Sequence, residues 1–159
     1  MRYFPLPSAV LFRLLQALWL AIAVAACSPL AGPFSEQAYR NATSLKARSL
    51  ALVAESGESF SDHRDEVAAL LTEIDAAYEY ARGLPRNEVV AEQWRLIRDP
   101  TTGQIGTFAV EWERRGRFGS VFREEFASEV AFAFDTLICV EITKKSADDC
   151  APELGSPQT

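Results

Sequence analysis

The sequence predicts an all-α protein, a single small helical bundle whose helices are joined by short loops. After residue 34, apolar residues recur at intervals of three and four, the spacing that places them on one face of a helix. Short groups of Gly, Pro, Asn and Asp separate these stretches, and such groups end helices and form turns. Only Thr107–Val110 also reads as a strand, and a lone strand would have no partner in this chain.

The first two predicted helices are the longest regular stretches in the first half of the bundle. Residues 35–56 begin with Ser35 as a cap and carry a stripe of mostly small residues, so a neighbouring helix can approach closely. Residues 59–82 carry an unbroken apolar stripe. Ser59 followed by Asp62 is typical of a capping box, and Gly83 and Pro85 end the helix.

Two shorter helices are expected next. Residues 87–98 follow Asn87, a favourable cap, and stop at Asp99 and Pro100. In the segment 104–115 the apolar residues again have helical spacing, which favours a helix ending at Gly116 over the extended alternative.

The last helix is expected to run from a Ser120 cap to about Lys145. Its middle is apolar nearly all round, which is typical of a helix surrounded by others, so we expect it to be the central element of the core. The acidic segment after it is predicted to be a tail, ordered at most as far as Cys150.

The N-terminus has the three parts of a secretory signal. Arg2 and Arg13 supply positive charge, residues 14–24 form an apolar run, and Ala25 and Ala26 are the small residues that a signal peptidase accepts. The run is shorter than the roughly 20 residues that span a bilayer core. An ordinary cleaved signal and an uncleaved anchor helix remain alternatives.

Val24-Ala25-Ala26-Cys27 resembles the lipobox of bacterial lipoproteins. The resemblance implies that the thiol of Cys27 receives a diacylglyceryl group, that the chain is cut before Cys27, and that the new amine is acylated, for example with palmitate. Several acyl chains hold a protein on a membrane far better than one. Position 28 is Ser and not Asp, and the absence of Asp there resembles the outer-membrane sorting pattern of enteric-type bacteria.

The lipobox sets the expected domain organisation. Residues 1–26 would be the lipoprotein signal peptide, 27–33 a lipidated tether, 34–146 the bundle domain and 147–159 the acidic tail. The protein would then sit on the bacterial envelope, on the periplasmic face of the outer membrane.

The charge balance limits the partners. The chain has 16 Lys and Arg against 22 Asp and Glu, and two of the arginines belong to the signal. An acidic surface argues against nucleic acid and against electrostatic binding to anionic lipid heads, so membrane attachment must come from the lipid.

Two cysteines remain after Cys27 is assigned to lipidation. Export would place Cys139 and Cys150 in an oxidising compartment, so we expect a disulfide that pins the tail to the last helix. The alternative is a buried free Cys139 that packs as a small apolar residue.

No catalytic or metal-binding motif is present, so we expect no cofactor and no enzyme. The one histidine, His63, lies among charged residues at the start of its helix, where a solvated or capping role is favoured. Glu125 and Glu129 share a helix face and could do acid–base work, although a solvated face is favoured. Asp135 lies in the most apolar part of the last helix and, if buried, must pair with a base such as Arg95 or Lys46.

The aromatic residues offer candidate contact positions. Trp112 stands among four charged residues, so we expect it to be an exposed contact residue. Trp94 is expected in the core. If the protein instead carries a small apolar ligand, the cavity between helices would be lined by aromatic side chains: Trp94, Phe126, Phe132 and Phe134.

The helical body also resembles small uncharacterised exported proteins of bacteria, in the stretches Asn41–Lys46 and Tyr78–Tyr80. This resemblance implies no activity and no site residue. The favoured hypothesis is a non-enzymatic lipoprotein that binds an envelope protein partner. A carrier of a small apolar ligand is the alternative, and an enzyme acting on envelope material through carboxylates is the least favoured.

Overall fold

The structure, a computed structural model, describes residues 32–154 of the 159-residue chain. Residues 1–31, which include the predicted signal peptide, Cys27 and most of the tether, lie outside the described residues. Within the described range the chain is helical and contains no strand, which confirms the predicted all-α bundle. The helices are α2 (Glu36–Glu55), α3 (Phe60–Gly83), α4 (Glu88–Arg98), α5 (Gln104–Arg115), α6 (Ser120–Thr143) and α7 (Ala147–Leu154).

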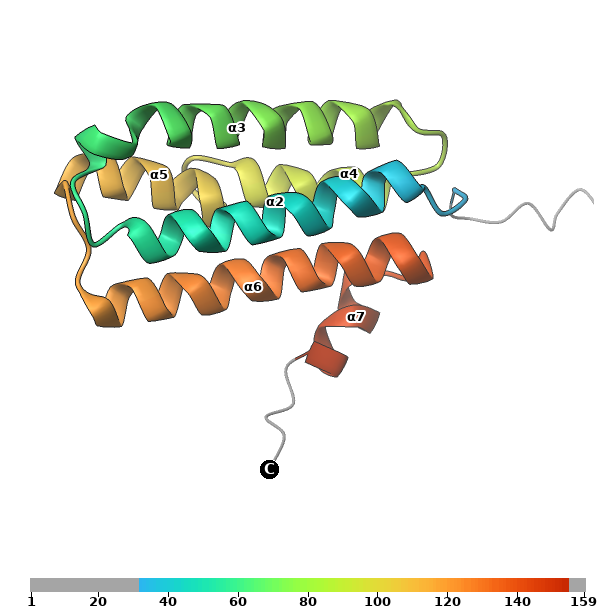
Figure 1. Cartoon of the computed structure of the whole chain (residues 1–159). Helices are drawn as coiled ribbons and strands as arrows, with labels where there is room; N and C mark the ends of the chain where they lie inside the picture. The colour runs from blue at the N-terminus through green and yellow to red at the C-terminus, as the bar shows by residue number, and fades with distance from the viewer. Residues whose placement is uncertain (1–31, 155–159) are drawn as a thin grey trace, which may run out of the picture. The chain divides into compact units, whose positions relative to one another are not determined.

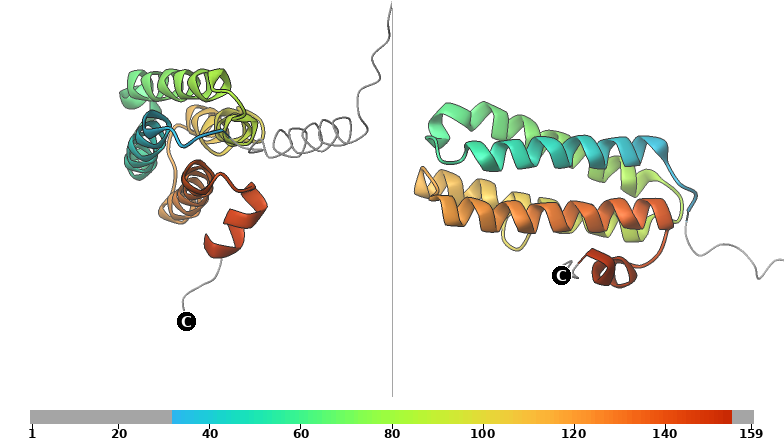
Figure 2. Two further views of the ribbon diagram at one scale, coloured as in Figure 1. Left: turned by 90° about the vertical axis from the view of Figure 1, so that its right-hand side faces the viewer. Right: turned by 60° about the horizontal axis from the view of Figure 1, so that its bottom comes forward.

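The bundle has four positions, one of which is shared by two helices. Helix α2 lies between α3 and α6, and α4 followed by α5 fills the remaining position (Figure 1). In the view along the helices, these elements surround one core and α7 packs on the outside against α6 (Figure 2, left). Short loops join neighbours that run in opposite directions, so the domain is an antiparallel four-helix bundle whose third helix is broken in two.

Helix α6 is the central element that its sequence predicts. It packs against α2, α4, α5 and α7. Phe134 is fully buried and meets the edge of the Trp94 ring, with ring centroids 5.9 Å apart. The apolar surround is incomplete, however, because Phe132 is 44% exposed.

Of the N-terminal caps predicted for the first two helices, the one at Ser35 forms and the one at Ser59 does not. The hydroxyl of Ser35 accepts a hydrogen bond from the backbone N–H of Ala38 at 3.2 Å, as a capping serine does. The predicted capping box at Ser59 is wrong. The Ser59 hydroxyl is paired with the hydroxyl of Ser61 at 2.9 Å and makes no hydrogen bond to the α3 backbone.

Asn87 and Ser120 also do not cap with their side chains. Asn87 stands directly before α4, but its side-chain amide donates to the carbonyl of Ala81 at 3.0 Å and so satisfies the end of α3 instead. The residue at the cap position of α6 is Gly119, and Ser120 is already the first helical residue.

The C-terminal segment is more ordered than predicted. Residues 147–154 form α7, which extends past Cys150, the expected limit of order. The hydroxyl of Ser146 accepts from the backbone N–H of Asp149 at 3.2 Å and starts the helix. Cys150 is buried and forms the predicted disulfide with Cys139 of α6, which fixes α7 against the bundle.

The break between α4 and α5 requires glycine. The backbone N–H of Gly103 donates to the carbonyl of Asp99 at 2.9 Å, which closes the turn that Asp99 and Pro100 start. A Cβ atom on Gly106 would collide with the backbone carbonyls of Arg98 and Asp99. The first turn of α5 therefore lies against the end of α4 only because position 106 has no side chain.

Hydrogen bonds between loops close both ends of the bundle. At one end, Phe60 N–H donates to the carbonyl of Gly116 at 2.9 Å, and Phe118 N–H donates to that of Ser56 at 2.8 Å. These bonds join the α2–α3 turn to the α5–α6 turn.

At the other end, buried Glu141 accepts from the backbone N–H of Ser35 at 2.7 Å and pairs with Lys144 at 2.8 Å. The N–H of Gly32 donates to the carbonyl of Arg86 at 2.7 Å. The chain is thus fastened where it enters the bundle.

We expect Gly106→Ala to destabilise the fold by about 2–3 kcal/mol, because backbone carbonyls, which cannot rotate away, occupy the space of the new methyl group. Gly83→Ala is the matched control. Gly83 ends α3, has no neighbouring atom where a Cβ would stand and does not have a positive φ, so alanine there should be neutral or stabilising by up to about 1 kcal/mol. Urea unfolding of both variants measures the difference. Equal stabilities would contradict the close approach of α5 to α4.

Candidate functional site

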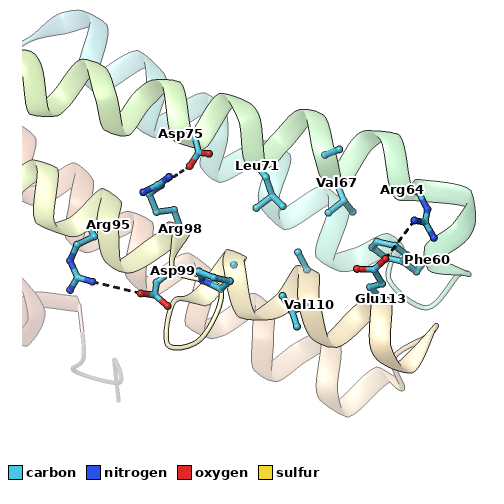
Figure 3. Close-up of a pocket in the computed structure, with 14 residues that line it drawn as sticks. Phe60, Arg64, Val67, Leu71, Asp75, Arg95, Arg98, Asp99, Val110 and Glu113 are labelled. Atoms are coloured by element: carbon cyan, nitrogen blue, oxygen red, sulfur yellow. Dashed lines mark hydrogen bonds and ion pairs between the residues drawn. The ribbon is translucent and has the colours of Figure 1, made fainter.

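A groove of about 520 Å³ lies between α3 and the α4–α5 pair. Figure 3 shows its lining residues, which come from the first four turns of α3, the end of α4, the loop at Asp99 and the length of α5. On α3 the lining extends from Phe60 to Asp75, which corresponds to roughly 22 Å of helix at 1.5 Å per residue. The groove is therefore elongated rather than round.

The floor of the groove is apolar. Val67 and Leu71 of α3 face Val110 of α5 across it (Figure 3), and Ala109 of α5 also belongs to the lining. Small residues keep the space between the helices open, among them Ala68 of α3 and Gly106 of α5, both of which belong to the lining. Because the α4–α5 break displaces the backbone here, α3 and α5 leave part of their facing apolar surfaces uncovered.

The rim carries three arginines, each next to a carboxylate. Arg64 lies 3.6 Å from Glu113, and Arg98 donates to Asp75 at 2.5 Å (Figure 3). Arg95 lies 3.7 Å from Asp99. The guanidinium of Arg98 also stacks over the ring of Tyr78, 4.7 Å from its centroid. Such a rim positions polar groups of both signs around an apolar floor, which suits binding of an amphipathic ligand.

Asp99 fixes the end of the groove. Its carboxylate accepts from the Thr101 hydroxyl at 2.6 Å, from the Thr101 N–H at 2.8 Å and from the Thr102 N–H at 3.0 Å. The hydroxyl of Thr101, followed by the two backbone N–H groups, lowers the pKa of Asp99 to about 2. The ionised carboxylate therefore holds the loop between α4 and α5 over the whole neutral and mildly acidic range.

The prediction that Trp112 is an exposed contact residue is wrong. Its side chain is fully buried and packs against Phe60 and Phe108, with ring centroids 5.6 and 5.5 Å away. The charged neighbours of Trp112 pair at the surface instead: Glu111 pairs with Arg114 and Arg115, and Glu113 lies 3.6 Å from Arg64. The helical spacing of Ile105, Phe108, Ala109 and Trp112 was the better guide to this position.

Trp94 and Phe126 are also core residues rather than pocket residues. Trp94 is buried against Phe134, and Phe126 packs among other phenylalanines: Phe108, Phe118 and Phe122. Phe132, in contrast, is 44% exposed and lines a separate surface hollow with Leu96 and Ile97. Among the described hollows, none is lined by Trp94, Phe126, Phe132 and Phe134 together, as the carrier hypothesis expects.

The structure assigns a partner to Asp135. Its carboxylate accepts a hydrogen bond from Lys46 of α2 at 2.5 Å, which is one of the two partners that the sequence offers. Both side chains remain partly exposed, so the pair joins α2 to α6 at the surface of the bundle. The helix-face pair Glu125 and Glu129 is exposed, as expected for a solvated face.

Sequence reasoning missed a second group of polar residues, around His63. The His63 side chain is only 12% exposed, so the expected solvated or capping role is wrong. Its ring lies beside Trp112, 5.4 Å between centroids, and contacts carboxylates of Glu58 and Glu66. The contact with Glu66 could have been predicted from the sequence, because Glu66 follows His63 by three residues on the same helix, whereas Glu58 and Trp112 come from other elements.

Comparison with known protein families, with curated proteins and with solved structures finds no match to this chain. Among residues 32–154, no helix combines the length and the apolar character that crossing a bilayer requires.

We expect the carboxyl group of Asp99 to titrate near pH 2, below the ordinary value of about 3.9. Because folding lowers this pKa, the stabilisation is present above about pH 4 and is lost as the pH falls toward 2. Side-chain carboxyl shifts followed by NMR measure the titration. Thr101→Val should raise the pKa of Asp99, since the hydroxyl is its strongest partner. A titration near pH 4 that does not respond to this substitution would contradict the assigned hydrogen bonds.

Proposed function

We propose that this protein is a lipid-anchored, non-enzymatic module of the bacterial envelope, located on the periplasmic face of the outer membrane. In this proposal Cys27 carries the lipid, and the groove between α3 and α4–α5 binds a segment of a partner protein. The observation that carries the binding role is the elongated groove itself, with its apolar floor and ion-paired rim.

The length of the groove favours a protein segment. An amphipathic helix of about four turns is roughly 22 Å long and would lay its apolar face on Val67, Leu71 and Val110. The charged rim then offers Arg64 and Arg98 to acidic side chains of the partner, and Glu113 and Asp75 to basic ones. These rim residues are already paired with one another, so they keep their positions before a partner arrives.

A small apolar ligand is the second candidate occupant, because a volume of about 520 Å³ lies within the range of ordinary small-molecule pockets. This carrier role uses a different place in the fold from the aromatic cavity that the sequence predicted.

The anchor is supported by the sequence alone. The signal-like N-terminus and the small residues before Cys27 support lipidation, as does the resemblance to a lipobox. The tether from Cys27 to Gly32 would be short. Because Gly32 and Ser35 are hydrogen-bonded to the bundle, a lipid on Cys27 would hold this end of the domain close to the membrane.

We expect the protein extracted from its own membranes to begin at Cys27 and to carry three acyl chains, with two hydrogens fewer than the reduced chain because of the Cys139–Cys150 disulfide. Intact-mass spectrometry measures both. Cys27→Ser should abolish lipidation and membrane retention, whereas Cys139→Ser with Cys150→Ser should keep the lipid. A full-length, unlipidated chain in the membrane would overturn the anchor and favour an uncleaved anchor helix.

The groove is tested by site-specific photo-crosslinking in the native envelope. A photoreactive side chain at Val110 should give a discrete adduct with one protein. The matched control is Val89, which is equally exposed, 46% against 47%, but does not line the groove. Ala68→Trp, which fills the groove, should abolish the adduct, while the neighbouring exposed substitution Ala69→Trp should not.

Three outcomes distinguish the candidates. A protein adduct from Val110 alone supports the partner-binding module. A small molecule that is retained in native mass spectrometry and displaced by Ala68→Trp supports the carrier. Identical adduct patterns from Val110 and Val89 would remove the groove as the binding surface.

A further inference from the structure

The end of the bundle away from the chain's entry point brings one imidazole and three carboxylates together. His63 lies in the first turns of α3, and its Nδ1 atom is 2.9 Å from Glu66 Oε2 and 3.7 Å from Glu55 Oε2. His63, Glu55 and Glu66 each offer one potential ligand atom, and these three atoms lie within 4.8 Å of one another. The Nε2 atom of the same ring is 3.2 Å from a carboxylate oxygen of Glu58.

Glu58 and Trp112 fix the orientation of the ring. Both ring nitrogens lie next to a carboxylate, Nδ1 next to Glu66 and Nε2 next to Glu58. In the tautomer that donates from Nε2 to Glu58, the lone pair of Nδ1 is directed toward Glu55 and Glu66 and is free to bind a cation. The Trp112 indole N–H donates to the Glu58 carbonyl at 3.3 Å, and the Trp112 ring lies against the imidazole. This is the arrangement of a metal-ligating histidine, whose second ring nitrogen donates to a carboxylate.

The charges of the cluster are not balanced by the described protein. Other carboxylates of the bundle, such as those on the groove rim, form ion pairs with arginine side chains. Among residues 32–154, the only ion-pair partner of Glu55, Glu58 and Glu66 is His63.

Arg123 and the end of α2 do not supply the missing charge. Arg123 of α6 donates to the carbonyl of Ala54, next to Glu55, and not to a carboxylate. Glu55 also ends α2, which has no basic residue in its last turn, so the helix dipole adds to the negative potential.

We propose that Nδ1 of His63 and the carboxylates of Glu55 and Glu66 bind a divalent transition-metal ion of the Zn²⁺ class, with Glu58 as a positioning residue. One nitrogen and two oxygens provide three of four tetrahedral ligands, and water would complete the shell. The imidazole nitrogen selects Zn²⁺ and its neighbours in the series over Mg²⁺ and Ca²⁺, which prefer oxygen-only shells.

The proposed ion takes the place of a proton. Hydrogen bonds to Glu66 and then to Glu58 raise the pKa of His63 above its ordinary value, so the cluster holds a proton on Nδ1 more readily than a free imidazole does. The metal must displace this proton, so one proton is released to solvent for each ion bound by the imidazolium form, and binding weakens as the pH falls. The titratable groups that face the ring are Glu55, Glu58 and Glu66; α5 contributes only the uncharged Trp112.

The test is isothermal titration of ZnCl₂ into the untagged full chain carrying Cys27→Ser, so that no other thiol or histidine competes. Cys139 and Cys150 are bonded to each other, and His63 is the single histidine. We expect saturable binding of one Zn²⁺ and no competition by MgCl₂. His63→Gln should abolish it, and Glu55→Gln or Glu66→Gln should weaken it at least about tenfold, as for loss of a ligand.

Two further variants separate the roles. Glu58→Gln should weaken binding by about 10–100-fold, the usual effect of removing a partner of a ligating histidine, and should change the His63 tautomer ratio in nitrogen NMR spectra. Asp65→Asn, an exposed acid next to Glu66 in sequence but outside the cluster, is the control and should bind as the parent chain does. Circular dichroism confirms that each variant is folded.

Nitrogen NMR of the single imidazole identifies the ligand atom. With Zn²⁺, the Nδ1 resonance should shift strongly while Nε2 retains its hydrogen. An absence of saturable Zn²⁺ binding, or equal affinity in the His63→Gln variant, would overturn the proposal. So would a shift confined to Nε2, because that atom faces Glu58. None of these results depends on the function of the groove.

Discussion

The contact between Gly106 and the end of α4 determines the form of this bundle. Two shorter helices, α4 and α5, stand in the place of one continuous third helix. The turn at Asp99 and Pro100 interrupts the helix, and the bare backbone at Gly106 lets α5 start directly against the carbonyls of Arg98 and Asp99. From that start, α5 carries Val110 to the groove floor and Trp112 to the His63 ring. Both candidate sites therefore depend on one close approach of two backbones.

Local signals in the sequence were sufficient for the helices and for their order. The Ser35 cap, the Asp99–Pro100 break and the Gly116 end each act within a few residues, so their effects can be predicted without knowledge of the fold. The disulfide was predictable because few cysteines compete. The extension of α7 to Leu154 was not predictable, since this helix depends on the Ser146 cap together with burial of Cys150.

The sites were harder to predict than the fold, because their residues meet through tertiary packing. Trp112 looked exposed since charges flank it in sequence, yet those charges form ion pairs at the surface while the ring is buried. His63 looked solvated since two of its partners, Glu55 and Glu58, come from α2 and the turn after it. The groove has no sequence motif at all: it is a space left between helices, and ordinary apolar residues line it.

The groove and the His63 cluster differ in charge balance, and this difference separates the ligands that they suit. Each arginine on the groove rim already has a carboxylate, so an incoming segment meets fixed groups of both signs and a nearly neutral surface. In the His63 cluster the carboxylates of Glu55, Glu58 and Glu66 face a single imidazole, and none of them forms an ion pair with a Lys or Arg of the described residues. Three carboxylates on one imidazole keep a net negative charge even when the ring is protonated. A cation is therefore the ligand that lowers the electrostatic energy of the cluster, whereas the groove gains chiefly from covering its apolar floor.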